Sequence, residues 1–221
     1  MNGTEPALRL NKIHYPVTAL GPGRRAALWL QGCHVGCRGC LSLDTWDPER
    51  APLTPVSQVA QDIVDILDAD PTLTGVTISG GEPSEQAPAL ISLLQTIRRR
   101  CAPRVPPLDV LMYSGLTWRK LSKEQPELLA LLDAVIPEPF VAAMAPGGRW
   151  RGSSNQPLLL LTDLARDRYA GVDDATAPSF QIVVEEGRLW TIGVPRPGDL
   201  DRVLEIAAVH GVTVEETSWR P

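Results

Sequence analysis

The sequence predicts an α/β fold in which helices alternate with the strands of a parallel sheet. Two observations support this prediction. Continuously apolar segments recur between residues 25 and 140, and segments with apolar side chains at helical spacing separate them. Continuous apolar strands are typical of a parallel sheet that is buried on both faces. The candidate functional motifs follow the strands directly, and such folds place their sites at the carboxyl ends of strands.

The first expected strand is "RAALWLQG" (25–32), which leads straight into a cysteine-rich segment. A helix should follow, with Thr54 as its N-cap and Pro55 at its first position. "GVTISGGEP" (75–83) predicts a second strand that breaks into a glycine pair. The helix expected after it carries one apolar face, made of Leu90, Leu93, Leu94 and Ile97.

The third expected strand is "LDVLMYSG" (108–115), and the fourth is "AVIPEPF" (134–140). Leucines at 128, 129 and 132 predict a short helix between them, and another helix is expected near 157–167. The pattern then changes. From residue 180 a hairpin, "FQIVVEEGRLWTIGVPRP", is followed by a helix, "GDLDRVLEIAAVHG", and a strand, "VTVEET". We therefore expect a core over 1–177 and a small appended α+β module of unknown role over 178–221.

Composition restricts the function classes. The chain has 43% hydrophobic and 21% charged residues and a net charge of −5, which is ordinary for a soluble globular protein. Its longest basic run is "RRR" (98–100), so we expect no nucleic acid as the primary partner. We also expect no membrane segment and no apolar leader, and therefore a cytoplasmic protein. Bunched cysteines in a reducing compartment indicate a metal or redox site.

Three of the four cysteines lie in "GCHVGCRGC" (32–40), with the spacing C-x3-C-x2-C: Cys33, Cys37 and Cys40. Four thiolates would complete a zinc site or saturate a four-iron cluster. Three thiolates leave one iron of a [4Fe-4S] cluster open for a further ligand. A zinc site that also uses His34 is the alternative, although His34 directly follows Cys33 and would reach the same ion awkwardly. Cys101 is interpreted as an isolated thiol.

The cysteine motif and "SGGEP" (79–83) resemble the cluster-binding and glycine-rich motifs of radical S-adenosylmethionine (SAM) enzymes. "YPVTALGPGRRAALWLQGCHVGCRGC" and "WRGSSNQ" (150–156) narrow the resemblance to the activating proteins of anaerobic ribonucleotide reductase, which are glycyl-radical-enzyme activases. The likeness extends over about residues 10 to 165. It implies a partial (β/α) barrel of the radical SAM type, with the C-terminal module added to it.

The resemblance also implies a chemistry. Cys33, Cys37 and Cys40 would bind the [4Fe-4S] cluster, and SAM would chelate the open iron. Reductive cleavage would give a 5′-deoxyadenosyl radical, which abstracts hydrogen from a glycine of a partner glycyl radical enzyme. An external flavodoxin or ferredoxin would supply the electron, since no second cluster motif is visible. No catalytic side chain beyond the cofactor site is assigned.

The same resemblance assigns cofactor-binding residues. Gly80 and Gly81 would let the backbone approach SAM, and Glu82 would lie near its methionine end. Ser114 would line the SAM pocket, and Arg151 could pair with the SAM carboxylate or the partner chain. Two plainer interpretations stay open: a strand end that packs against its helix at Ser114, and an ordinary solvated loop around Arg151.

The chain departs from the family pattern at three places that bear on the partner. Leu41 follows the third cysteine where the branch has an aromatic residue, "PEPF" (137–140) stands where an Asp-Gly pair precedes the phenylalanine, and the module after 177 has no counterpart. Two alternatives therefore remain. One is a small radical SAM enzyme that modifies a peptide or a small molecule. The other is a non-enzymatic iron–sulfur or zinc module, which the glycines of "SGGEP" disfavour.

Overall fold

The protein is described here by a computed structural model that covers residues 5–171, 180–185 and 188–214. Its main element is a seven-stranded sheet with the strand order β3-β1-β2-β4-β5-β6-β7. The strands are β1 (Ala7–Val17), β2 (Arg24–Leu30), β3 (Leu53–Pro55), β4 (Leu73–Gly80), β5 (Asp109–Tyr113), β6 (Ala134–Ile136) and β7 (Leu159–Leu160). A separate hairpin pairs β8 (Phe180–Glu185) with β9 (Arg188–Gly193).

The centre of the large sheet is parallel. Strands β2, β4, β5 and β6 run in the same direction and pair in this order, and each overlaps one of the four strands expected from the sequence. Antiparallel strands flank them, β1 and β3 on one side and β7 on the other. The α/β class and its parallel core are therefore confirmed.

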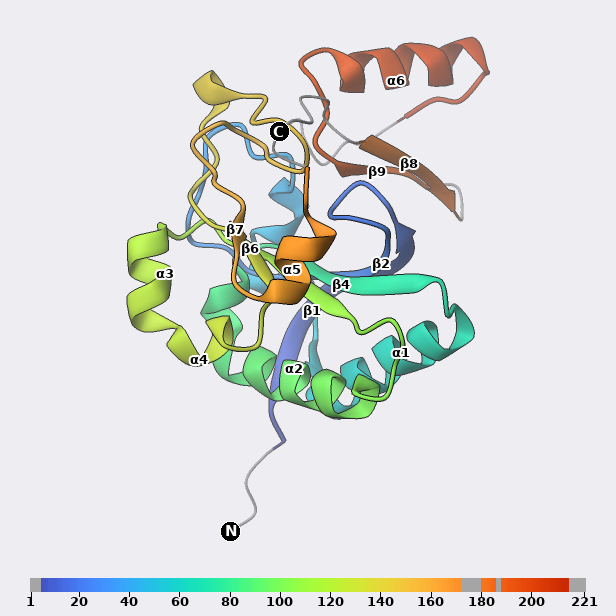
Figure 1. Cartoon of the computed structure of the whole chain (residues 1–221). Helices are drawn as coiled ribbons and strands as arrows, with labels where there is room; N and C mark the ends of the chain where they lie inside the picture. Colours follow the sequence, from blue (N-terminus) through green and yellow to red (C-terminus); the bar gives the residue numbers. More distant parts are fainter. Residues whose placement is uncertain (1–4, 172–179, 186–187, 215–221) are drawn as a thin grey trace.

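Helices cover one face of this sheet. They are α1 (Val56–Ala69), α2 (Ala87–Cys101), α3 (Trp118–Glu124) and α4 (Pro126–Leu129), and Figure 1 shows α1 and α2 lying side by side beneath the strands. Their apolar stripes form one core with the residues of β2 that face them, Ala26, Leu28 and Leu30. In the described part of the chain, no helix is both long and apolar enough to cross a membrane.

Several details differ from the sequence expectation. Strand β1 and helix α3 were not predicted. Helix α1 begins only at Val56 and has no side-chain cap, so Thr54, the expected N-cap, and Pro55, the expected first helical residue, both lie in β3. The helix expected near 157–167 is instead the short strand β7 followed by α5 (Asp163–Arg168), whose N-cap is Thr162. In the last expected strand, residues 212–214 are irregular and the rest lies outside the described residues.

The other face of the sheet carries the C-terminal hairpin. Ala27 and Trp29 of β2 point to this face and pack with Ile192 of β9. The Trp190 ring lies 6.4 Å from the Trp29 ring, edge to face. Gln181 fixes the hairpin to the end of β1, because its amide donates to the Pro16 carbonyl at 3.0 Å. Figure 1 shows this hairpin and α6 (Asp199–Val209) on the side opposite α1 and α2. The expected boundary at 177 falls among residues that the structure does not describe.

A buried ion pair lies at the amino ends of the parallel strands. Arg25 of β2 and Asp109 of β5 are both 0% exposed, and two hydrogen bonds of 3.0 and 2.8 Å join them. Arg168 and the Tyr169 hydroxyl also donate to the Asp109 carboxylate. Burial alone would raise the pKa of Asp109, but these donors and the Arg25 charge outweigh it and hold that pKa below its ordinary value.

Replacing Asp109 with Asn should destabilise the fold strongly, because the Arg25 charge stays buried without its counter-ion. Removing one partner of a buried pair costs about 3–5 kcal/mol. Urea unfolding of Asp109→Asn measures the free-energy loss. Asp163→Asn is the control, because its pair with Arg166 is solvent-exposed and should contribute little. Equal midpoints for the two variants would contradict the assignment.

Because of the same ion pair, the free energy of unfolding should decrease at acidic pH. A carboxylate with a lowered folded-state pKa contributes stability above its unfolded pKa and loses it as the pH falls through the folded value. The difference in stability between wild type and Asp109→Asn should therefore be full at neutral pH and shrink only in acid.

Candidate cluster and cofactor site

The three-cysteine loop begins where β2 ends. Backbone hydrogen bonds from Gly32 to Thr45 (2.8 Å) and from Cys33 to Trp46 (3.0 Å) fold the segment back on itself. Gly36 and Gly39 have left-handed φ values of +65° and +80°, which residues with a Cβ adopt only with strain. The glycines between the cysteines are therefore required by the loop itself, and all three thiols are half-buried.

The Ser42 N–H donates to Cys40 Sγ at 3.4 Å. The backbone N–H groups of Val35 and Gly36 lower the pKa of Cys33, and that of Phe140 lowers the pKa of Cys37, against the larger effect of burial. Val35, Gly36 and Ser42 belong to the loop itself, whereas Phe140 follows β6. Backbone N–H groups aimed at sulfur are what iron–sulfur thiolates require for charge stabilisation.

The three cysteines do not form a ready-made site for a single metal ion. Among the described residues, no three His, Cys, Asp or Glu side chains already surround a common point. A four-iron cluster does not need such a point, because each thiolate binds a different iron atom. His34, the fourth ligand of the zinc alternative, is engaged elsewhere: its Nδ1 lies 2.8 Å from Glu85 Oε2.

The glycine-rich loop after β4 lies directly against the cysteine loop. Gly81 donates to the Leu30 carbonyl and Glu82 donates to the Gly32 carbonyl, both at 2.8 Å. A Cβ on Gly81 would lie 2.1 Å from the Gly32 oxygen, and one on Gly80 would lie 2.4 Å from the backbone of Leu30. Both glycines are therefore needed to bring the two loops together, whether or not SAM approaches them as well.

Glu82 is 1% exposed, and its carboxylate is surrounded by donors. Oε1 accepts from the Ser84 N–H (3.0 Å) and from the hydroxyls of Ser84 (2.6 Å) and Ser114 (2.9 Å). Oε2 accepts from the Gly115 N–H at 2.6 Å. The carboxylate thus joins the carboxyl end of β4 to that of β5, a role that the sequence did not indicate.

Ser114 and its neighbours end β5 beside the cysteine loop. Ser114 is 4% exposed, and a Cβ on Gly115 would lie 3.1 Å from the methyl groups of Val35 in that loop. Tyr113 points to the opposite sheet face, where its hydroxyl donates to the Trp150 carbonyl at 2.9 Å. The structure therefore brings Ser114 together with the cysteine and glycine-rich loops.

Most of the "WRGSSNQ" block binds backbone rather than facing solvent. Ser153 is fully buried, and the side chains of Ser153, Asn155 and Gln156 all bond to the segment 138–141. Trp150 is 2% exposed and packs on the sheet with Tyr169. Arg151 differs from these, because its half-buried guanidinium forms no hydrogen bond or ion pair with any residue that the structure describes. The solvated-loop interpretation is wrong for the block as a whole.

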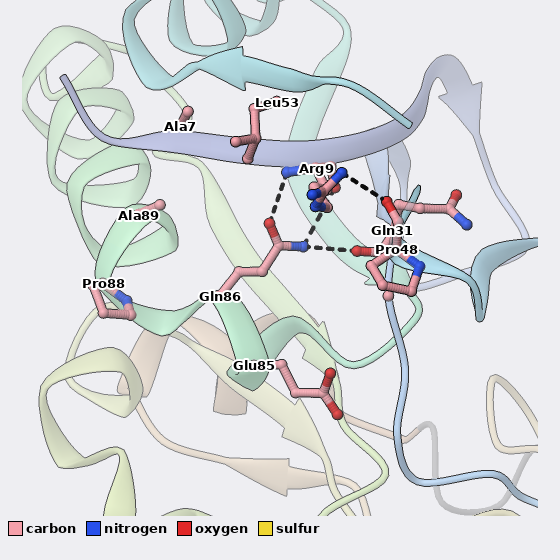
Figure 2. A pocket seen from close by; sticks show the side chains of 10 residues that line it. Ala7, Arg9, Gln31, Pro48, Leu53, Glu85, Gln86, Pro88 and Ala89 are labelled. Carbon is pink, nitrogen blue, oxygen red and sulfur yellow. Dashed lines mark hydrogen bonds between the residues drawn. The ribbon is translucent and has the colours of Figure 1, made fainter. Parts of the chain in front are cut away.

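A pocket of about 380 Å³ lies beside the cysteine loop, lined in part by Arg9, Gln31, Gly32 and Gln86. Figure 2 shows the Gln86 amide at its centre, bonded to the backbone of Arg9 and to the Gln31 carbonyl. Gln31 in turn donates to the carbonyls of Asp44 and Asp47. The polar groups here tie β1 and the loop after β4 to the end of β2, and sequence reasoning missed them.

Comparison with known proteins supports a cluster site. Residues 19–159 match the family described as "4Fe-4S single cluster domain". The chain is similar to proteins named anaerobic ribonucleoside-triphosphate reductase-activating protein from Vibrio cholerae and Escherichia coli K12. Each is 31% identical over 147 residues, which are 65% of this chain and 92% or 93% of the relative. A protein of the same name from phage T4 is 28% identical over 148 residues, 88% of its length.

Cluster uptake by the apoprotein should improve as the pH rises. Burial raises the pKa of the Cys33 and Cys37 thiols above their ordinary value, although nearby backbone N–H groups oppose this shift. Both thiols are therefore protonated at neutral pH, and metal binding must displace those protons. Anaerobic reconstitution at pH 7 and pH 9, with bound iron and sulfide measured, should give the higher yield at pH 9. Uptake that does not change with pH would contradict the prediction.

Proposed function

Because the chain belongs to the 4Fe-4S single cluster domain family and to the family of anaerobic ribonucleoside-triphosphate reductase-activating proteins, we propose that it is a radical SAM enzyme. Its substrate is a glycine of a partner glycyl radical enzyme, such as anaerobic ribonucleoside-triphosphate reductase. The names of the relatives supply the class of partner. The observation that carries the proposal is the contact between the three-cysteine loop and the glycine-rich loop after β4.

Cys33, Cys37 and Cys40 would hold the [4Fe-4S] cluster through their thiolates. A cluster bound there would supply the electron for reductive cleavage of SAM, and this chemistry would provide the radical that abstracts hydrogen from the partner's glycine. The protein itself binds the cluster and SAM, orients SAM toward the glycine, and excludes water from the site. The half-buried loop and the backbone N–H groups at its sulfurs suit these tasks.

The residues expected to bind the cofactor have two different roles. The backbone at Gly80 and Gly81 lies next to the cysteine loop, so SAM bound there would be close to the open iron. Ser114 and Glu82 would have a structural role, because the Ser114 hydroxyl donates to the Glu82 carboxylate and so connects the ends of β5 and β4. The Arg151 guanidinium has no hydrogen-bond or ion-pair partner among the described residues, so it is free to pair with a SAM carboxylate.

The parallel strands and the helices on one face are compatible with a partial (β/α) barrel of the radical SAM type. Residues 178–221 would be a module appended to a core over 1–177. The proposal places the protein in the reducing cytoplasm, where an external flavodoxin or ferredoxin would deliver the electron. Oxygen would destroy a cluster with an exposed iron, and the reducing cytoplasm would protect such a cluster.

One observation favours a second candidate. The two relatives match over 92% and 93% of their own length but only 65% of this chain, so the C-terminal module has little counterpart in them. A module that packs on the sheet face beside Trp29 could adapt the enzyme to another substrate. The second candidate is therefore a small radical SAM enzyme that modifies a peptide or a small molecule.

Replacing Cys37 with Ala should abolish SAM cleavage, because one cluster ligand is lost. The assay is anaerobic reconstitution, addition of dithionite and SAM, and chromatography of 5′-deoxyadenosine. Wild type should form this product, and Cys37→Ala should form none above background. Cys101→Ala is the matched control, because Cys101 ends α2 within the helix-side core and should be dispensable. Turnover retained by Cys37→Ala would refute the ligand assignment.

A further inference from the structure

Two segments that are distant in the sequence meet at the cysteine loop. Gly39 lies between the last two cysteines, and a Cβ on it would be 3.4 Å from the Ala142 Cβ and 3.6 Å from Phe140 Cε1. At the opposite corner of that ring, a Cβ on Gly152 would be 3.0 Å from Phe140 Cδ2. The Phe140 ring is therefore held between the cysteine loop and the "WRGSSNQ" block. Figure 1 shows the segment after β6, in yellow, beside the light-blue cysteine loop at one end of the sheet.

Apolar side chains are exposed on these joined segments. Leu41 directly follows the third cysteine and is 40% exposed, and Val141 and Met144 are 36% and 42% exposed. The Met144 carbonyl accepts from the Ser154 N–H at 2.8 Å. The Val141 N–H donates to the Ser153 hydroxyl at 3.1 Å, so the block fixes the backbone of both residues. Exposed apolar side chains that gather from separate segments are typical of an interaction surface.

Two exposed arginines lie in the same segments. Arg38 belongs to the cysteine loop, and Arg149 directly precedes the block, where its guanidinium carbon lies 5.1 Å from the centre of the Trp150 ring. Neither guanidinium forms a hydrogen bond or an ion pair with any part of the chain that the structure describes. These two arginines, together with Leu41, Val141 and Met144, form what we call the cluster face.

The charge of these arginines is available to a partner. Two acidic residues near the loop are engaged elsewhere: Glu85 Oε2 lies 2.8 Å from His34 Nδ1, and Glu49 pairs with Arg9 at 2.9 Å. The whole chain has a net charge of −5, so a basic area on its surface is local. Such an area directs where, and in which orientation, an acidic protein can bind.

The position of the cluster face indicates which acidic protein it fits. Arg38 lies between Cys37 and Cys40, so a protein that contacts Arg38 comes within a side chain's length of both residues. Electron transfer to a cluster requires such a close approach, whereas a partner's glycine must reach SAM at Gly80 and Gly81. An electron carrier therefore fits this face better than the glycyl radical enzyme does.

We propose that the cluster face is the docking site of an acidic electron-carrier protein. The inference rests on the proposed function, because it requires a cluster on the three cysteines. Carboxylates of the carrier would pair with the two guanidinium groups, and its apolar surface would cover Leu41, Val141 and Met144. The reduced carrier would lose one electron and the oxidised cluster would gain it, with no bond made or broken.

The test measures the binding of a flavodoxin, as the acidic probe, to the reconstituted protein by isothermal titration calorimetry. Wild type should bind it more weakly at about 300 mM than at about 50 mM NaCl, because salt screens exposed charges. Arg38→Glu should weaken the binding at low salt about tenfold. Arg99→Glu is the matched control, because Arg99 is also exposed but lies on α2, on the helix side of the sheet. Its affinity should equal that of wild type.

A change of reductant separates docking from chemistry. With dithionite, which needs no docking site, Arg38→Glu and wild type should cleave SAM at the same rate. With reduced flavodoxin at a fixed concentration, Arg38→Glu should be slower. If Arg38→Glu takes up no cluster, Arg149→Glu is tested in its place, with the same expected direction.

The outcomes distinguish the inference from the proposed function. Wild type that binds no flavodoxin would overturn the inference alone. Unchanged flavodoxin affinity in a cluster-loaded variant would do the same, also where that variant binds a glycyl radical enzyme more weakly. Wild type that takes up no cluster, or that cleaves no SAM with dithionite, would overturn the proposed function.

Discussion

The buried Glu82 carboxylate organises the carboxyl edge of the parallel sheet. It accepts hydrogen bonds from Ser84, Ser114 and Gly115, while its own N–H donates to Gly32. The ends of β2, β4 and β5 are thereby joined through a single residue. A buried carboxylate without such donors would be strongly unfavourable, so the three strand ends and the carboxylate stabilise one another. The cysteine loop begins at this junction.

The two ends of the sheet use buried charge differently. At the amino ends, Arg25 and Asp109 neutralise each other inside the fold and leave no group for a ligand. At the carboxyl ends, the buried Glu82 carboxylate is stabilised by N–H and hydroxyl donors, and the thiols beside it remain half-buried. Reactive groups are therefore found where strand ends open into loops, which is the general position of sites in parallel α/β folds.

Sequence reasoning located the parallel strands and the cysteine loop, because continuous apolar runs and cysteine spacing are local signals. It missed β1, whose polar Lys12 and His14 face Trp190, a residue far along the chain. It also missed the bonds of Glu82, since Ser114 lies 32 residues away. The family pattern has Asp-Gly before the phenylalanine, and here Glu138 takes a left-handed φ that the distant Gln156 and Leu116 support. Pairings between distant residues leave no periodic trace in a sequence.

The central claim is that hydrogen bonds of the chain itself assemble the site edge before any cofactor binds. Amide hydrogen exchange of the cluster-free protein tests this directly at Gly81, Glu82 and Gly115, whose N–H groups are all bonded. Exchange at these amides should be slowed strongly relative to an unstructured peptide, to a level similar to that of the strand amides. Free exchange at these three amides, with protection only after cluster and SAM are added, would contradict it.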